Sequence, residues 1–309
     1  MFRRALGLLL LLLSLGLHAQ NIIDARTATV LSYWETGNTK RYKLTRTKTG
    51  ERQANTSVSI DLKVLASTDS TYDVEFKYHD MQLPGDALPD PRAAMAVEKM
   101  AHAVDGLRVV AKVDGNGGNV LEVMNAPEIK AHCDRILDGI VELSTDPEER
   151  AQMRAVFDKM ITEDALTTSA LEDISYFVLP FGLRYELGRS ETLDAEFPNP
   201  LGGDPLPGTM DIGMKALDTK AGTARIHCSQ RVDPAKLNAF IKTYLASLGH
   251  SGSASDMREL EKLLRGMKVD HDIDYDVDLD GAWIRKARSK QVVEVAGARQ
   301  TDERVYELQ

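Results

Sequence analysis

Apolar and polar residues alternate along several stretches of this chain, and that period of two constrains the fold more than any other sequence feature. The alternation is clearest in 41–48, 56–65 and 72–78. A β-strand sends successive side chains to opposite faces, so each stretch is predicted to be a strand with one buried face. Turn-forming Gly, Ser, Thr and Asp residues separate the stretches. We therefore predict a β-meander over 27–83.

Apolar residues at helical spacing mark the other main component of the fold. Two helices are predicted to begin near residues 125 and 145, and four more are predicted over 91–104, 164–177, 233–248 and 255–267. Further strand pairs are predicted between the helices and at the end of the chain. The predicted fold class is α+β, an antiparallel β-sheet of meanders and hairpins packed on one side against five or six helices.

The helix that begins near residue 125 carries a start signal in its sequence. Asn125 precedes Pro127, and Glu128 follows three positions after the asparagine. An asparagine with a glutamate three positions later is typical of a capping box at a helix N-terminus. We expect the Asn125 side chain to cap this helix.

A stretch rich in proline and glycine, 197–208, is predicted to be the junction within the chain. It separates an N-terminal region of meander plus helices, 20–196, from a C-terminal region of strands, two helices and a final hairpin, 209–309. The order of elements recurs after the boundary. Two similar halves and one composite domain are therefore both open alternatives.

The amino terminus has the charge, length and order of an export signal. Met1–Arg4 carries two arginines, Ala5–Leu17 is a 13-residue apolar stretch, and Ala19 is a small residue at the cleavage position before Gln20. We expect residues 1–19 to be a signal peptide and the mature protein to be periplasmic or extracellular. No cysteine follows the apolar stretch, so we do not expect a lipoprotein. No later segment reaches the ~20 apolar residues of a membrane-spanning helix.

Composition excludes several classes of protein. The 309 residues include 38 Lys and Arg against 47 Asp and Glu, a formal net charge of −9. An apolar fraction of 43% is enough for a sizeable core, which excludes a fully disordered chain. An acidic surface repels phosphate backbones, so a nucleic acid is not an expected partner.

Aspartate occupies every second position from Asp270 to Asp280, with apolar residues at most of the positions between. In a strand these six carboxylates share one face at ~7 Å spacing, and their repulsion calls for cations nearby. The return strand supplies them in Arg285, Lys286, Arg288 and Lys290. We favour cross-strand pairing between the two rows.

Calcium binding is the alternative for the same hairpin. Asp276, Asp278 and Asp280 with the following glycine match the opening of an EF-hand loop. The twelfth position of such a loop is Ala287 here, which has no oxygen for the ion. No other cofactor is predicted.

The two cysteines, Cys133 and Cys228, are disulfide candidates because the chain carries an export signal. Both fall on positions predicted to face the core. A bridge between them and two buried thiols that never meet are both open alternatives.

Catalytic signatures are absent from the sequence. There is no Gly-x-Ser-x-Gly elbow, no His-Glu-x-x-His zinc helix and no phosphate-binding Gly-rich loop that opens a helix. His271 lies on the apolar side of the aspartate strand, where a packed or paired histidine is favoured over a general base. No residue is predicted to be catalytic.

The segments 109–123 and 273–284 look like the paired strand, Asp-Gly turn and strand of uncharacterised exported bacterial domains, and the Ala19-Gln20 boundary is similar to that of Bacteroidota-like or other Gram-negative exported proteins. Some of those domains resemble half-barrels of the LolA/LppX type, which hold a lipid or acyl chain between a curved antiparallel sheet and covering helices. The resemblance implies a lipid-binding plan over most of 27–309 and transfers no ligand residue.

These observations predict an exported, soluble, non-enzymatic binding protein of the bacterial envelope whose ligand is a lipid or another apolar molecule. The alternative is an envelope interaction or assembly factor that docks a partner protein through sheet edges or the acidic hairpin.

Overall fold

The computed structural model describes most of the chain beyond residue 20. The described residues are 21–50, 54–83, 95, 99, 104–160, 162–197, 206–247, 268–295 and 297–309. The expected signal peptide (1–19), the helix at 255–267, most of the helix at 91–104 and most of the junction at 197–208 lie outside them.

Within the described ranges the chain is mostly β, with thirteen strands and four helices. The prediction of an α+β fold with five or six helices is therefore wrong. One reason is that three strands carry too little sequence signal to be predicted: β7 (Arg184–Glu186), which has only three residues, and β8 (Ser190–Phe197) and β13 (Ala298–Leu308), which are poor in apolar residues. The three-residue strand β1 (Thr27–Thr29) falls within the predicted meander but pairs with β7.

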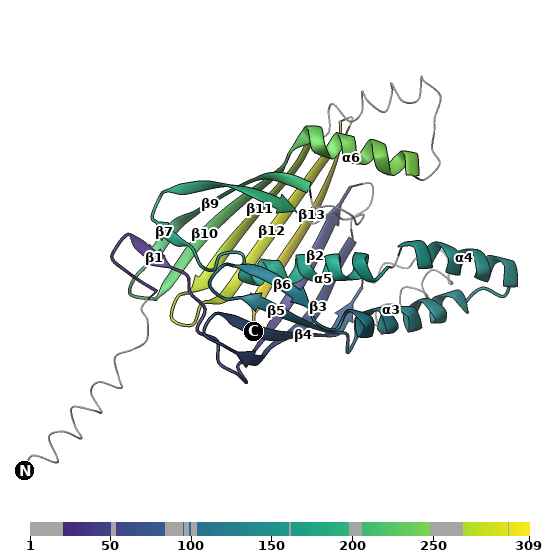
Figure 1. Cartoon of the computed structure of the whole chain (residues 1–309), viewed down its shortest axis with the longest axis horizontal. Helices are drawn as coiled ribbons and strands as arrows, with labels where there is room; N and C mark the ends of the chain where they lie inside the picture. Colours follow the sequence, from purple (N-terminus) through teal and green to yellow (C-terminus); the bar gives the residue numbers. More distant parts are fainter. Residues whose placement is uncertain are drawn as a thin grey trace, which may run out of the picture.

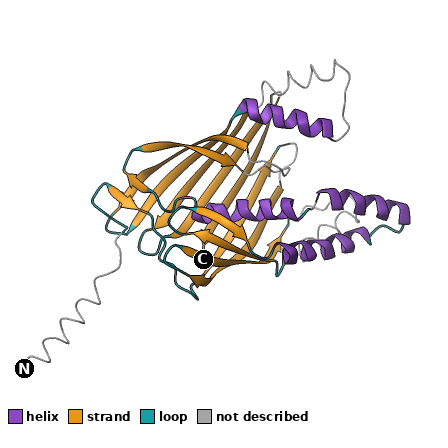
Figure 2. Ribbon diagram, viewed as in Figure 1, coloured by secondary structure: helices purple, strands orange, loops and turns teal. Residues whose placement is uncertain are grey.

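Eleven strands form one antiparallel sheet, which Figure 2 shows as a broad, twisted layer. From edge to edge the strands are β6 (Asn119–Val123), β5 (Arg108–Asp114), β4 (Thr71–Gln82), β3 (Ala54–Ser67), β2 (Thr39–Thr49), β13, β12 (Trp283–Val295), β11 (Lys268–Asp278), β10 (Thr223–Val232), β9 (Leu206–Asp218) and β8. Neighbouring strands are consecutive in the chain everywhere except at β2 and β13. These two pair in register from Tyr42 with Leu308 to Thr49 with Thr301. The strands on either side of the helices therefore belong to one continuous sheet.

The helices lie in three places around the sheet (Figure 1). Helix α5 (Glu163–Val178) lies against one face, which we call the inner face. Helices α3 (Ala126–Val141) and α4 (Pro147–Met160) extend beyond the sheet, and α6 (Pro234–Ser247) lies at the end of the sheet where β10 ends. The short strands β1 and β7 pair as a separate ribbon.

The sheet curves around the C-terminal end of α5. Tyr176 contacts residues of β11 and β12, and Phe177 packs on rings of β2, β4 and β13. The next residue, Val178, lies against Gly118 in the β5–β6 turn. In a flat sheet β5 and β11 would be about 29 Å apart, because strands are spaced by about 4.8 Å. Three consecutive helical residues reach both sides only because the sheet wraps around them.

Gly118 is required for this close approach. Its φ is +65°, and a Cβ there would lie 2.8 Å from the carbonyl oxygen of Val178. Any side chain would therefore push the β5–β6 turn away from the end of α5.

The capping prediction for Asn125 is wrong in its detail. Asn125 is the N-cap residue of α3, but its side chain makes no capping hydrogen bond. Its Oδ1 accepts from the backbone N–H of Val110 at 2.8 Å, and its Nδ2 donates to the carbonyl of Arg108 at 3.1 Å. The side chain is 7% exposed and fixes the start of α3 to β5, a role that a local sequence pattern does not reveal.

Candidate functional site

The inner face carries a polar cluster beneath α5. His271 Nε2 lies 2.7 Å from Ser289 Oγ, and Ser289 donates a hydrogen bond of 3.3 Å to the Tyr176 hydroxyl. The Tyr176 ring meets the His271 ring edge to face at a centroid distance of 6.0 Å. The cluster joins β11 and β12 to the last turn of α5.

A serine paired with a histidine is also the arrangement of a catalytic nucleophile and its base. Ser289 is only 2% exposed, and Tyr176 lies over it at 4% exposure. A nucleophile must reach its substrate, and this hydroxyl has no such access. The cluster therefore anchors α5 to the sheet, as the sequence favoured for His271.

A second polar group, which we call the basic cluster, lies on the inner face of β2 and β13. It consists of Arg46, Lys48, Asp302, Arg304 and Asp173. The Arg46 guanidinium donates to both carboxylate oxygens of Asp302, with Nη2–Oδ2 at 2.5 Å and Nε–Oδ1 at 2.9 Å. Lys48 Nζ lies 3.9 Å from the same carboxylate. Arg304 donates to Asp173 of α5 at 3.0 Å.

The electrostatics of the basic cluster are dominated by its cations. Burial raises the pKa of the Asp302 carboxyl, but the hydrogen bond from Arg46 and the charges of Arg46, Arg304 and Lys48 outweigh it, so this pKa lies below its ordinary value of 3.8. Three cations therefore act on one carboxylate. On the other side of the cluster, burial and the Asp173 carboxylate raise the pKa of Tyr306 and of Tyr78 well above the usual range.

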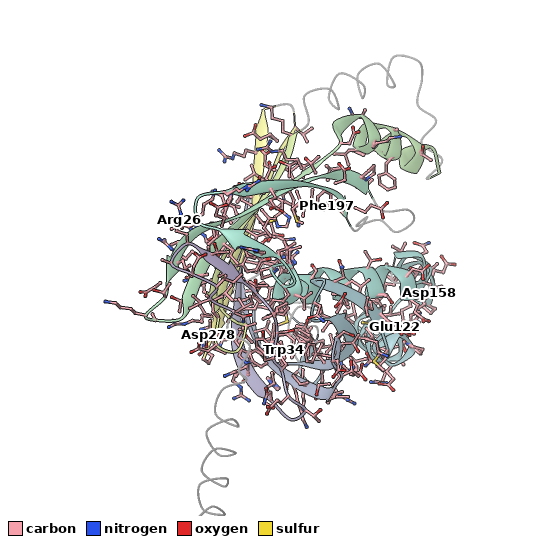
Figure 3. All side chains as sticks on the ribbon, turned by 60° about the vertical axis from the view of Figure 1, so that its left-hand side comes forward. Arg26, Trp34, Glu122, Asp158, Phe197 and Asp278 are labelled. Atoms are coloured by element: carbon pink, nitrogen blue, oxygen red, sulfur yellow. The ribbon has the colours of Figure 1, made fainter. Side chains whose placement is uncertain are left out.

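The inner face between α5 and α6 is partly covered and carries several apolar side chains, with the polar Gln230 and Gln291 among them. Strand register places Met210 opposite Leu193 and Val269 opposite Val293. Val269 lies two residues from His271 on β11, so these side chains face the same way as the cluster beneath α5. Figure 3 shows Phe197 at the α6 end of the sheet, far from Asp278 at the other end. We call this half-buried set the apolar strip: Leu193, Phe197, Met210, Val232, Val269 and Val293.

The aspartate row of β11 lies on the opposite, outer face. Its neighbours carry the opposite charge, as predicted: Asp272, Asp274 and Asp276 are in register with Lys290, Arg288 and Lys286 of β12. On the other side, His227 of β10 is 2.9 Å from Asp274. Two of these cations also form ion pairs on their other side, Lys286 with Glu307 and Arg288 with Glu303 of β13, so they are shared between two rows of carboxylates.

The three calcium candidates do not form a cage. Asp276 and Asp278 lie on β11, and Asp280 lies in the turn, where its backbone N–H donates to the Asp278 carboxylate at 3.1 Å. Within the part of the chain that the structure describes, no group of three or more His, Cys, Asp or Glu side chains is placed to hold a metal ion.

The two cysteines are free thiols in the structure. Cys228 is buried on β10, and burial raises its pKa to about 12, assisted by the carboxylates of Asp272 and Asp211. Cys133 is half-buried on α3, where burial also raises its pKa. Both thiols are therefore poor nucleophiles at neutral pH.

A groove of about 790 Å³ crosses the outer face near the C-terminus. Arg225, Arg285 and Lys286 line it together with Asp218, Asp276 and Glu307. Lys286 donates to Glu307 at 2.6 Å. Cations and carboxylates are balanced in this groove, so it does not select a ligand of either charge.

The basic cluster and the apolar strip were missed in the sequence, although one signal was present. On β2 the apolar residues Tyr42 and Leu44 are followed at the same parity by Arg46 and Lys48. A change from apolar to cationic along one strand face marks the place where the covered core ends. Their partners Asp173 and Asp302 come from distant parts of the sequence, so the cluster itself leaves no local pattern.

No protein-family model matches the sequence, and no curated protein matches it. Among solved structures, one described as lipid–protein interactions in lipovitellin is similar, with a TM-score of 0.43 and 9% sequence identity. The match covers 89% of this chain and 25% of the lipovitellin chain, so the chain spans a quarter of the protein it matches. At that identity and TM-score the similarity carries no argument about function.

No helix in the described ranges is long and apolar enough to span a membrane.

Proposed function

We propose that this chain is an exported, non-enzymatic carrier of the bacterial envelope that binds a lipid acyl chain along the apolar strip. The observation that carries the proposal is the unequal cover of the inner face. Helix α5 fills the curve of the sheet over β2, β4, β12 and β13, whereas the strip that continues from β8 to β12 remains half-buried.

The size of the strip fits a long acyl chain. Five strands at about 4.8 Å spacing give a width of about 19 Å. A micromolar complex requires about 8 kcal/mol, and each buried methylene contributes about 0.8 kcal/mol. A ligand therefore needs about ten or more methylenes on the strip, and the apolar width accommodates them.

The alternative of docking a basic partner through the acidic hairpin has less physical support than the carrier. It requires a row of carboxylates without cations beside it, and Lys286, Arg288 and Lys290 lie in register with that row, although Lys286 and Arg288 also pair with Glu307 and Glu303 of β13. No specific observation favours docking through a sheet edge, so the carrier is the function that the geometry supports best.

The test is displacement of the apolar fluorophore N-phenyl-1-naphthylamine from the protein comprising residues 20–309 by 1-dodecanol. We expect binding by the wild type and at least tenfold weaker binding by Val269→Asp, because the ligand would have to desolvate a carboxylate in the strip. The matched control is Val305→Asp on β13, whose side chain lies on the outer face opposite Arg288 and Thr45. We expect the control to change binding less than twofold.

Two results would contradict the carrier. One is the absence of fluorophore binding by the folded wild type, and the other is equal weakening by the two Asp variants. A native mass spectrum of the protein from its own host provides an independent readout, since a carrier should release a discrete mass on denaturation.

A further inference from the structure

We propose that the ligand is a single-chain amphiphile with an anionic headgroup, whose chain lies on the apolar strip and whose headgroup contacts Lys48 in the basic cluster. The inference rests on the proposed carrier function and names the class of ligand. Two observations support the inference: the basic cluster lies near the apolar strip on the same face, and the cluster contains more cations than carboxylates.

The cluster lies directly beside the strip on the same face. Strand register pairs Gln291 of β12 with Asp302 of β13, and Asp302 with Lys48 of β2. Val293 of the strip is two residues along β12 from Gln291, on the same face. Two strand spacings across the sheet, about 10 Å, and two residues along the strand, about 7 Å, therefore separate Val293 from the lysine, a distance of about 12 Å. A headgroup attached to a chain on the strip reaches the cluster without crossing the sheet.

The cluster as defined has three cations and two carboxylates. Arg46 holds Asp302 through a bidentate pair, the geometry in which a guanidinium and a carboxylate satisfy each other. Lys48 is 48% exposed and reaches that carboxylate only at 3.9 Å. Its ammonium therefore retains donors for a further anion. The lowered pKa of Asp302 agrees with a positive potential at this place.

The arrangement also disfavours other headgroups. A cationic headgroup would be repelled by the net positive charge of the cluster, in which Arg46 and Arg304 are paired with Asp302 and Asp173 and the ammonium of Lys48 is left in excess. A neutral headgroup would gain nothing from the lysine. The basic cluster thus selects the headgroup by its charge, whereas the apolar strip accepts any acyl chain of suitable length.

The test compares four probes that share a twelve-carbon chain: dodecanoate, dodecyl phosphate, 1-dodecanol and dodecylammonium. Binding to the protein of residues 20–309 is measured by calorimetry at pH 8, below the micelle concentration of each charged probe and below the solubility limit of dodecanol. We expect dodecanoate or dodecyl phosphate to bind about tenfold more tightly than dodecanol, and dodecylammonium to bind more weakly than dodecanol. The relative affinities of the two anions distinguish a carboxylate headgroup from a phosphate headgroup.

The substitution Lys48→Gln should weaken the anionic probe three- to tenfold and leave dodecanol within twofold of the wild type. The matched control is Lys43→Gln, an exposed lysine of the same strand on the outer face, which should change neither. Raising the salt concentration should weaken the anionic probe alone, because the lysine is half-exposed.

The failure of this inference can be told from the failure of the carrier. If dodecanol and the anions bind equally and Lys48→Gln has no effect, the ligand class is wrong and the carrier stands. If no probe binds to the folded protein, the carrier itself is wrong, and the inference is wrong with it.

Discussion

Phe177 is the residue on which the packing of α5 depends most directly. It is 2% exposed, and its ring lies 4.8 Å from that of Tyr42, 5.3 Å from Phe76 and 5.2 Å from Tyr306. These rings come from β2, β4 and β13, so one side chain contacts both sides of the junction where the first and last long strands meet. The substitution Phe177→Ala removes all three contacts together.

Deleting a fully buried phenylalanine ring costs about 3–5 kcal/mol, because the cavity left behind adds to the lost transfer free energy. Each ring pair contributes a further ~0.5–1.5 kcal/mol beyond area burial. We expect the free energy of unfolding to fall by about 4 kcal/mol. With a urea m-value near ~3 kcal/mol/M, the midpoint should fall by about 1 M or more.

The assay is urea unfolding followed by tryptophan fluorescence and circular dichroism. Trp34 and Trp283 stack at a centroid distance of 4.6 Å, so their fluorescence reports the contact between the N-terminal and C-terminal parts of the chain. The control Val156→Ala alters a side chain that is 52% exposed on α4 and should cost less than about 0.5 kcal/mol. A loss below about 1 kcal/mol for Phe177→Ala, or one no larger than the control, would refute the view that α5 fills the curve of the sheet.

Two further predictions concern ionisable groups. In the folded protein at pH 8, a thiol reagent should leave Cys228 unmodified, because burial raises the pKa of this thiol to about 12. After unfolding in guanidinium, both cysteine thiols should react with the reagent. Rapid modification of Cys228 in the folded protein, or the absence of reactive thiols after unfolding, would contradict the structure. Asp302 has a lowered pKa, so its ionised form stabilises the fold above about pH 4, and this stabilisation is lost as the pH falls below 3.8 towards the folded-state value. The stability difference between wild type and Asp302→Asn should therefore shrink in acid, and a difference that is constant from pH 7 to pH 3 would argue against the pairing with Arg46.

Most long strands could be predicted from the sequence because their signal is local. The predicted stretches 41–48, 56–65 and 72–78 fall within β2, β3 and β4, and the cross-strand cations opposite the aspartate row of β11 are also as expected. In each case the alternation is confined to a few consecutive residues, and the hairpin turn fixes the register with the next strand.

The strand β13 shows where this reasoning stops. Its sequence is mostly polar or charged, and the residues Arg304 and Asp302 stand at inner-face positions that the alternation rule reserves for apolar side chains. They are tolerated there because Asp173 of α5 and Arg46 of β2 neutralise them. A charged residue at a core-facing position therefore does not exclude a strand, because an oppositely charged side chain from a distant part of the sequence can neutralise it in the folded protein.

The sequence by itself determined most of the long strands, the faces of those strands and the charge pattern of the acidic hairpin, because each depends on neighbours within about ten residues along the chain. Only the tertiary structure decided that β2 pairs with β13, that one sheet curves around α5, and that the basic cluster lies beside the apolar strip. Those features join residues separated by most of the chain length, and the free energy that selects them comes from contacts that exist only after the chain has folded.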